Sequence, residues 1–243
     1  MNTTIDPAEY EKFSKMAEEW WNPSGKFKAL HKFNPKRIEF IKEKLVKHFN
    51  ITKDDIKPLN KLNILDIGCG GGLLSEPMSR LGANVTGIDI VEKNINIANA
   101  HSSESGLNIK YRCITAEELS NENKKFDVIL NMEVIEHVSD LNLFMESCEK
   151  LLKKDGILFF ATLNRNIMSF GLAILGAEYV LGWLPKGTHD WNKFVTPDEI
   201  KILLRSSGLK INELVGMKYN PIYDSWYLSE DTSVNYLGTA TKS

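Results

Sequence analysis

Short apolar runs alternate with amphipathic segments through the middle of the chain. The apolar runs have the length of buried strands and lie at 62–67, 83–88, 108–113, 126–131 and 157–163. Segments with apolar residues at helical spacing lie between them, at 73–81, 93–105 and 141–153. Strands that alternate with helices of this length predict an α/β fold with a doubly wound, mostly parallel sheet.

The pattern changes toward the two ends of the chain. At the start, a helix is expected over Asp6–Trp21, capped by Asp6, and a second one is expected to open at Asn34-Pro35 and reach His48. At the end, a capped helix is expected over 196–207, followed by strands over 209–219 and 234–241. A terminal pair with a short return connection fits an antiparallel strand at the sheet edge. We therefore expect a Rossmann-like sheet of seven strands.

The length favours one large domain with additions over two domains. We expect a single domain over residues 1–243. Its parts are a helical cover, a ligand-binding core, an apolar insertion and a C-terminal helix with strands, at 1–60, 61–163, 164–195 and 196–243.

A glycine-rich stretch directly follows the first expected strand. Gly68, Gly70, Gly71 and Gly72 fill four of five positions, which excludes a helix or strand interior and lets the backbone approach a ligand closely. The next strand ends in Asp89, where a carboxylate can accept both hydrogen bonds from a ribose diol. This order predicts a cofactor that contains a nucleoside.

The glycine pattern also separates cofactor classes. A dinucleotide fingerprint needs a third glycine where this chain has Leu73. The pattern from Asp66 to Gly72, Asp-x-Gly-x-Gly-x-Gly, instead resembles motif I of class I S-adenosylmethionine-dependent methyltransferases.

A second polar motif follows the fourth expected strand. If a helix begins at Glu133, then Glu136 and His137 lie on the same face as Glu133. Two carboxylates and an imidazole can hold a divalent cation such as Mg²⁺. Alternatively, His137 acts as a general base oriented by a glutamate, or the motif is only a polar helix start. Met132, at the strand tip, is placed to touch an adenosine.

Several other residues are ambiguous from the sequence alone. Trp20-Trp21 fit core packing and a ligand cover equally well, and Arg37 is expected at the surface. Thr162–Asn166 follow an apolar strand and are expected at the rim of a substrate site. His189 is a second base candidate in a loop.

Residues 167–183 are almost wholly apolar, with Glu178 as the single charge. As a helix they span about 25 Å, which is short of the roughly 30 Å hydrocarbon core. Arg165 and Lys186 flank them, as in a segment that lies at a membrane interface. A buried insertion helix is the alternative.

The composition limits the cell compartment and the binding partners that we expect for the protein. Thirty basic and 32 acidic side chains leave a net charge of −2, which provides no field to attract nucleic acid. Three scattered cysteines fit reduced thiols, and the first residues have no signal-peptide pattern. We therefore expect a cytoplasmic protein, peripherally associated with the inner face of the membrane through 167–183.

The chain from Lys12 onward resembles the ubiquinone biosynthesis O-methyltransferases. The segments that carry the resemblance are Phe27–His31 with Asn34-Pro35, Asp66–Gly72, Glu133–His137, Thr162–Asn166, Gly176–Tyr179 and Pro185–Asp190. The glycine motif and the Glu-His box are shared by many small-molecule methyltransferases, whereas Thr162–Asn166 and Pro185–Asp190 are far more particular.

The resemblance implies an S-adenosylmethionine-dependent O-methyltransferase. Its expected substrates are prenylated catechols and demethylubiquinol, methylated at both O-methylation steps, and other quinone-biosynthesis enzymes are expected partners. Arg37, Gly68, Asp89 and Met132 are then expected to contact the cofactor, with Gly70 in the same loop. This reverses the surface interpretation of Arg37, which can pair with the methionine carboxylate.

Three alternatives remain at this stage. The chain could methylate another small apolar phenol, or it could be an NAD-dependent oxidoreductase, which Leu73 disfavours. It could also bind S-adenosylmethionine without catalysis, as a scaffold in a biosynthetic assembly, which Glu133, Glu136 and His137 argue against.

Overall fold

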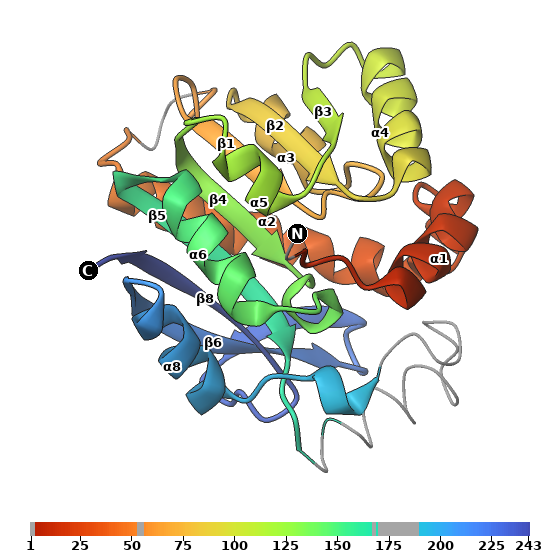
Figure 1. Cartoon of the computed structure of the whole chain (residues 1–243). Helices are drawn as coiled ribbons and strands as arrows, with labels where there is room; N and C mark the ends of the chain where they lie inside the picture. Colours follow the sequence, from red (N-terminus) through yellow and green to blue (C-terminus); the bar gives the residue numbers. More distant parts are fainter. Residues whose placement is uncertain (1–2, 53–55, 167–168, 170–189) are drawn as a thin grey trace.

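The computed structural model describes residues 3–52, 56–166, 169 and 190–243. One sheet of eight strands runs through the described part of the chain, in the order β3-β2-β1-β4-β5-β8-β6-β7 (Figure 1). The strands are β1 (Asn63–Ile67), β2 (Asn84–Asp89), β3 (Lys110–Cys113), β4 (Phe126–Met132), β5 (Leu152–Leu163), β6 (Leu209–Asn220), β7 (Ser225–Ser229) and β8 (Asn235–Lys242).

The first five strands are parallel, as the sequence predicts, and the last three are antiparallel. The expected class of fold is therefore confirmed, with one more strand than the seven expected. The additional strand is β7, which pairs with β6 as a hairpin and lies at the sheet edge. Its sequence has no apolar alternation long enough to mark it.

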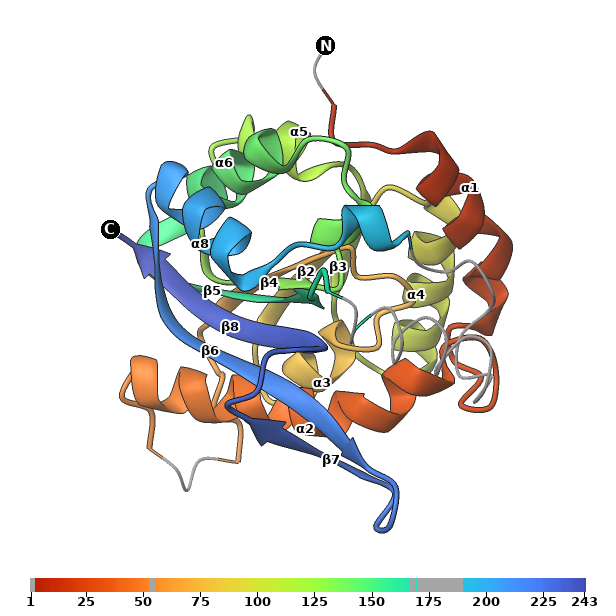
Figure 2. The same cartoon turned by 90° about the horizontal axis from the view of Figure 1, so that it is seen from below.

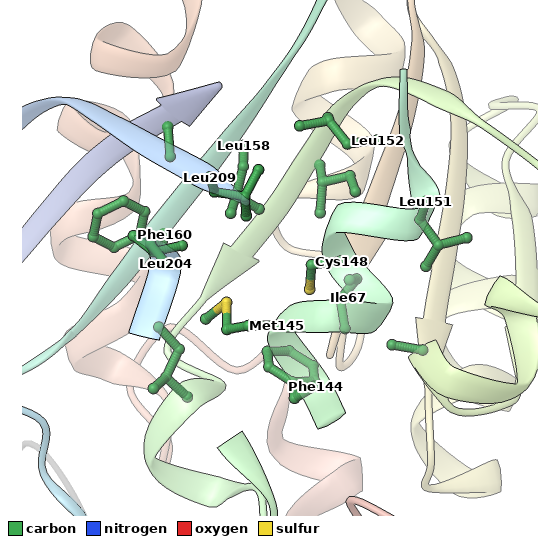
Figure 3. Packing of buried hydrophobic residues seen from close by; sticks show 14 of the residues in the cluster. Ile67, Phe144, Met145, Cys148, Leu151, Leu152, Leu158, Phe160, Leu204 and Leu209 are labelled. Atoms are coloured by element: carbon green, nitrogen blue, oxygen red, sulfur yellow. The ribbon is translucent and has the colours of Figure 1, made fainter. Parts of the chain in front are cut away.

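Helices cover both faces of the sheet. They are α1 (Pro7–Met16), α2 (Lys28–His48), α3 (Ser75–Arg80), α4 (Glu92–Glu104), α5 (Ala116–Ser120), α6 (Leu141–Leu151) and α8 (Pro197–Ser206). Figure 2 shows α5, α6 and α8 on one face and α2 and α3 on the other. In the core below α5, α6 and α8, Met145 and Phe144 lie close to Ile67, and Leu204 lies close to Phe160 (Figure 3).

Helix α2 corrects one boundary of the sequence prediction. It begins at Lys28 rather than at Asn34-Pro35, so Pro35 lies inside the helix. A proline there removes one helical hydrogen bond and normally kinks or breaks the helix. The turns before Pro35 are held by tertiary contacts, which the local sequence does not reveal. Ala29 is buried, Phe33 packs against the core, and Asn34 Nδ2 donates to Leu73 O at 2.8 Å.

The topology brings three strand ends together. Strand β1 lies between β2 and β4, so the chain after β1 turns where the strand order reverses. Ligands of open α/β sheets bind outside the carboxyl ends of the strands at this point. The glycine loop, Asp89 and Glu133 all lie at or directly after those ends.

Candidate active site

The loop after β1 has the left-handed backbone that glycine permits. Gly68 has φ 67° and Gly70 has φ 54°. A Cβ at Gly68 would lie 2.6 Å from Val134 Cγ2, and one at Gly70 would lie 2.3 Å from the Trp20 ring. Only glycine fits at these two positions, because both the dihedral angle and the space exclude a side chain.

Asp89 ends β2 and is bonded to the same loop. Its Oδ2 accepts a hydrogen bond from Gly70 N at 3.0 Å, and its Oδ1 accepts bonds from Val91 N at 2.8 Å and Asn94 Nδ2 at 3.2 Å. Burial raises the pKa of Asp89, while these hydrogen bonds lower it. Asp89 lines the cavity described below, where the predicted ribose contact would lie, and it also fixes the glycine loop.

The two tryptophans cover this loop. The Trp20 ring lies against Gly70 and Gly71, stacks on Phe27 at 3.8 Å and donates from Nε1 to Asn94 Oδ1 at 2.8 Å. Trp21 Nε1 donates to Gly71 O at 2.9 Å. The N-terminal segment is thus a cover of the glycine loop, and Trp20 also lines the cavity.

Asn94 is a site residue that the sequence analysis missed. It links Asp89 to Trp20, since its amide donates to one and accepts from the other. The available signal was its position on α4, where Asn94, Ala98 and Ser102 recur at helical spacing and are buried.

Arg37 is buried and lines the cavity. Its side chain is only 5% exposed, so the expectation of a surface arginine is wrong. Nη2 donates to Glu133 Oε1 at 2.9 Å, while Nε is buried without a hydrogen-bond partner among the described residues. A buried guanidinium with a remaining donor fits the carboxylate of a bound amino acid.

The Glu-His motif does not form the helix that was expected. Glu133 has φ 60°, and the short 3₁₀ helix η2 covers only Ile135–His137. Glu133 therefore turns toward Arg37, while the buried Glu136 accepts from Thr162 Oγ1 at 2.8 Å. Burial, followed by the charge of Glu133, raises the pKa of Glu136 well above its usual range.

His137 contacts the N-terminal helix instead of the two glutamates. Its Nδ1 lies 3.0 Å from Oε2 of Glu9, and the Phe13 ring meets the imidazole edge to face at 5.0 Å. Lys12 and Lys193 also pair with Glu9. Burial alone would raise the pKa of Glu9, but His137 and Lys12 lower it to about 2.

Glu9 is the second residue that the sequence analysis missed. It is buried on α1 and lies on the same helical face as Phe13 and Met16. A carboxylate within an apolar stripe was the available signal, because a buried charge needs a partner. Its partner is 128 positions away, so local pattern could not supply it.

A metal site with Glu133, Glu136 and His137 as ligands does not fit this arrangement. Among the described residues, no group of three His, Cys, Asp or Glu side chains is close enough to hold a metal ion. Glu133 is held by Arg37 and His137 contacts Glu9. The raised pKa of Glu136 favours its neutral form, which is a poor cation ligand.

The residues that follow β5 hold part of the cavity wall in place. Asn164 Nδ2 donates to Thr232 O at 2.9 Å, and Asn166 Nδ2 donates to Ser233 O at 2.5 Å. Ser233 and Val234 line the cavity, so these two amides hold part of its wall. His189 and residues 167–183 other than Ser169 lie outside the described residues.

One cavity of about 680 Å³ joins these groups. Asp66, Asp89, Met132, Glu133 and His137 line it at the strand ends, and Phe33, Tyr219, Pro221 and Trp226 line it elsewhere. Asp66 is buried and accepts from Ser75 Oγ at 2.6 Å, and burial raises its pKa to about 7. The volume lies within the range of small-molecule sites.

Comparison with solved structures identifies the fold. The magnesium protoporphyrin IX methyltransferase of Synechocystis PCC 6803, solved with bound S-adenosylhomocysteine, aligns with a TM-score of 0.66 over 97% of this chain and 100% of that chain, at 19% identity. Residues 28–214 match the profile of the methyltransferase domain family. The chain is therefore an S-adenosylmethionine-dependent methyltransferase of class I.

Curated relatives identify the family within this class of methyltransferases. The ubiquinone biosynthesis O-methyltransferase of Parvibaculum lavamentivorans is 52% identical over 99% of this chain and 95% of its own length. That of Bartonella bacilliformis is 54% identical over 97% of this chain and 95% of its own length. The chain belongs to the family of ubiquinone biosynthesis O-methyltransferases.

Proposed function

We propose that the protein transfers the methyl group of S-adenosylmethionine to phenolic hydroxyls of prenylated catechol and demethylubiquinol intermediates, at both O-methylation steps. The observation that carries this proposal is one cavity whose lining combines the buried Arg37 and Asp89 with apolar side chains such as Phe13 and Val138. The polar groups suit a charged cofactor, and the apolar ones suit a phenol. Another small apolar phenol is the alternative substrate.

The residues around the glycine loop have the groups that S-adenosylmethionine needs. Asp89 offers a carboxylate for the ribose diol, Gly68 and Gly70 allow close backbone approach, and Arg37 has a donor for the methionine carboxylate. When bound, the cofactor supplies an electrophilic methyl group on a sulfonium. These assignments, with Met132 at the adenosine, are predictions for binding measurements.

His137 is the proposed general base. A phenol with a pKa near 10 is only about one part in a thousand ionised at pH 7, so a base must take its proton. His137 lines the cavity, and its Nδ1 lies beside the Glu9 carboxylate, which fixes the orientation of the ring. The Glu9 carboxylate then stabilises the imidazolium that forms, as the acid does in a catalytic triad.

This role of Glu9 can be tested by removing its charge alone. We expect Glu9→Gln to lower kcat by about tenfold or more on an ordinary catechol, with little change in KM, because charged hydrogen bonds contribute roughly 1.5–3 kcal/mol. A nitrocatechol, which is largely ionised at neutral pH, needs no base. Its turnover should be nearly unchanged by the substitution.

The matched control lies on the same helix. Glu11 of α1 is exposed and forms a long ion pair of 3.9 Å with Lys15, so Glu11→Gln should leave both substrates unaffected. Equal losses on catechol and nitrocatechol in Glu9→Gln would show that Glu9 only stabilises the N-terminal helix.

Product analysis tests the function itself. Labelled S-adenosylmethionine and a short-chain demethylubiquinol should give a singly O-methylated product, and a prenylated catechol should do the same. No step of the proposed reaction uses a metal ion, so turnover should survive a chelator. If chelation abolishes turnover and added Mg²⁺ restores it, the metal prediction replaces His137 as the base.

Membrane contact through 167–183 and association with other quinone-biosynthesis enzymes stay predictions. Within the described part of the chain, no helix has the length and apolar character needed to cross a bilayer. A long prenyl tail costs about 0.8 kcal/mol per methylene to move into water. An enzyme acting on such a substrate gains from contact with the inner membrane surface.

A further inference from the structure

The hairpin of β6 and β7 exposes apolar side chains at its tip. Ile222 is 84% exposed and Tyr223 is 78% exposed, and both are in the turn between the strands. Figure 2 shows this hairpin projecting beyond the rest of the molecule. Single exposed apolar residues are ordinary, but two adjacent ones on a projecting turn, with Tyr227 also exposed nearby, form a patch.

Hairpin residues next to the patch line the cavity. Pro221, directly before Ile222, lines the cavity together with Tyr219 and Trp226 from the two strands of the hairpin. The Trp226 ring centroid lies 5.4 Å from those of Tyr219 and Phe33. The cavity wall therefore reaches the hairpin at Pro221, the residue next to the exposed tip.

Lysine side chains near the tip neutralise the aspartate of the turn. Asp224 is the acidic residue of the turn, and its Oδ1 accepts from Lys32 Nζ at 2.7 Å and from the Tyr219 hydroxyl at 2.5 Å. The pKa of Asp224 is lowered by the Lys32 hydrogen bond first, and the charge of Lys28 adds to this. Lys32 therefore neutralises Asp224, and Lys28 adds a second positive charge near it.

We propose that the hairpin tip, residues 219–227, is a second membrane-contact element, which inserts Ile222 and Tyr223 into the interface of an anionic bilayer. Tyrosine and large apolar residues favour the boundary between headgroups and acyl chains, and nearby lysines are attracted to anionic lipids. The proposal of bilayer contact rests on the exposed patch and does not depend on the proposed function. The further statement, that an apolar substrate enters the cavity along the hairpin, rests on the proposed function.

Vesicle sedimentation of the full chain tests the contact. The probe is a phosphatidylethanolamine vesicle that contains phosphatidylglycerol. We expect the double variant Ile222→Ser, Tyr223→Ser to partition at least about tenfold more weakly than the unmodified protein, because transfer of apolar area drives insertion. Its affinity for S-adenosylmethionine and its turnover of a water-soluble catechol should not change.

The chain offers a matched control. Ile202 on α8 is 70% exposed and α8 lies on the opposite face of the sheet from α2, so Ile202→Ser removes one exposed isoleucine, as Ile222→Ser does, but from a different surface. It should leave partitioning unchanged. Three outcomes would overturn the proposal. The double variant and the unmodified protein could partition equally, neither could sediment with vesicles, or Ile202→Ser could lose as much partitioning as the double variant.

Two further readouts distinguish membrane contact from self-association of the protein and from failure of the methylation reaction. If sedimentation velocity shows a dimer that the double variant dissociates, while its vesicle partitioning is unchanged, the patch is a self-association surface and the membrane proposal is wrong. If the unmodified protein binds vesicles but does not methylate a short-chain demethylubiquinol, the proposed function fails and the contact surface stands.

Discussion

Replacement of His137 by alanine is expected to lower kcat by about 10²–10⁴-fold, the usual contribution of a positioned general base. The affinity for S-adenosylmethionine should stay within a few fold, since His137 contacts Glu9 and Phe13 rather than the glycine loop. The acid limb of the pH–rate profile should flatten, because that limb reports protonation of the base. Steady-state kinetics across the acid and neutral pH range would show both effects.

His48→Ala is the control for a general effect of losing a histidine. His48 lies at the exposed end of α2, where its Nε2 is 3.0 Å from Asp155 O. Circular dichroism and the melting temperature must show that His137→Ala remains folded, because the variant also removes a partner of the buried Glu9. A folded variant with an unchanged kcat would exclude His137 as the base.

Asp89→Ala should weaken S-adenosylmethionine binding by at least about tenfold. The carboxylate is expected to accept hydrogen bonds from the ribose, and each such bond to a charged group contributes roughly 1.5–3 kcal/mol. The structure adds a second reason, since the variant also loses the bond from Gly70 N that fixes the loop. Isothermal titration calorimetry measures the loss directly.

The melting temperature without cofactor separates the two reasons. Loss of the loop bond lowers the stability of the free protein, whereas loss of a ribose contact does not. Glu92→Ala, at the exposed start of α4, is the nearby control and should bind normally. Unchanged affinity in a folded Asp89→Ala protein would contradict the assignment.

The parallel half of the sheet could be predicted because its residues follow a simple rule. Buried parallel strands such as Val128–Leu130 are apolar on both faces, so they stand out from the helices between them. The edge hairpin could not be predicted in the same way. Strand β7 is half exposed, and its residues take their conformation from pairing with β6 rather than from their own pattern.

The candidate site shows the same division between local and distant causes. The glycine loop and Asp89 could be located, because strand, loop and acid are separated by fixed short distances. The conformation of Glu133 was missed, since helical spacing assumes a helix and the residue instead adopts φ 60° and meets Arg37. The contact of Glu9 with His137 joins opposite regions of the chain, and no local spacing encodes it.

The tryptophans over the glycine loop, Trp20 and Trp21, are internal fluorophores beside the predicted cofactor site. Trp20 is enclosed against Phe27, whereas the Trp21 ring stacks on His101 at 3.4 Å, and His101 lies 2.6 Å from Glu76. Because both indoles contact the glycine loop, a ligand that binds there should change their emission. A stopped-flow fluorimeter can then follow the arrival and departure of S-adenosylmethionine with unlabelled protein.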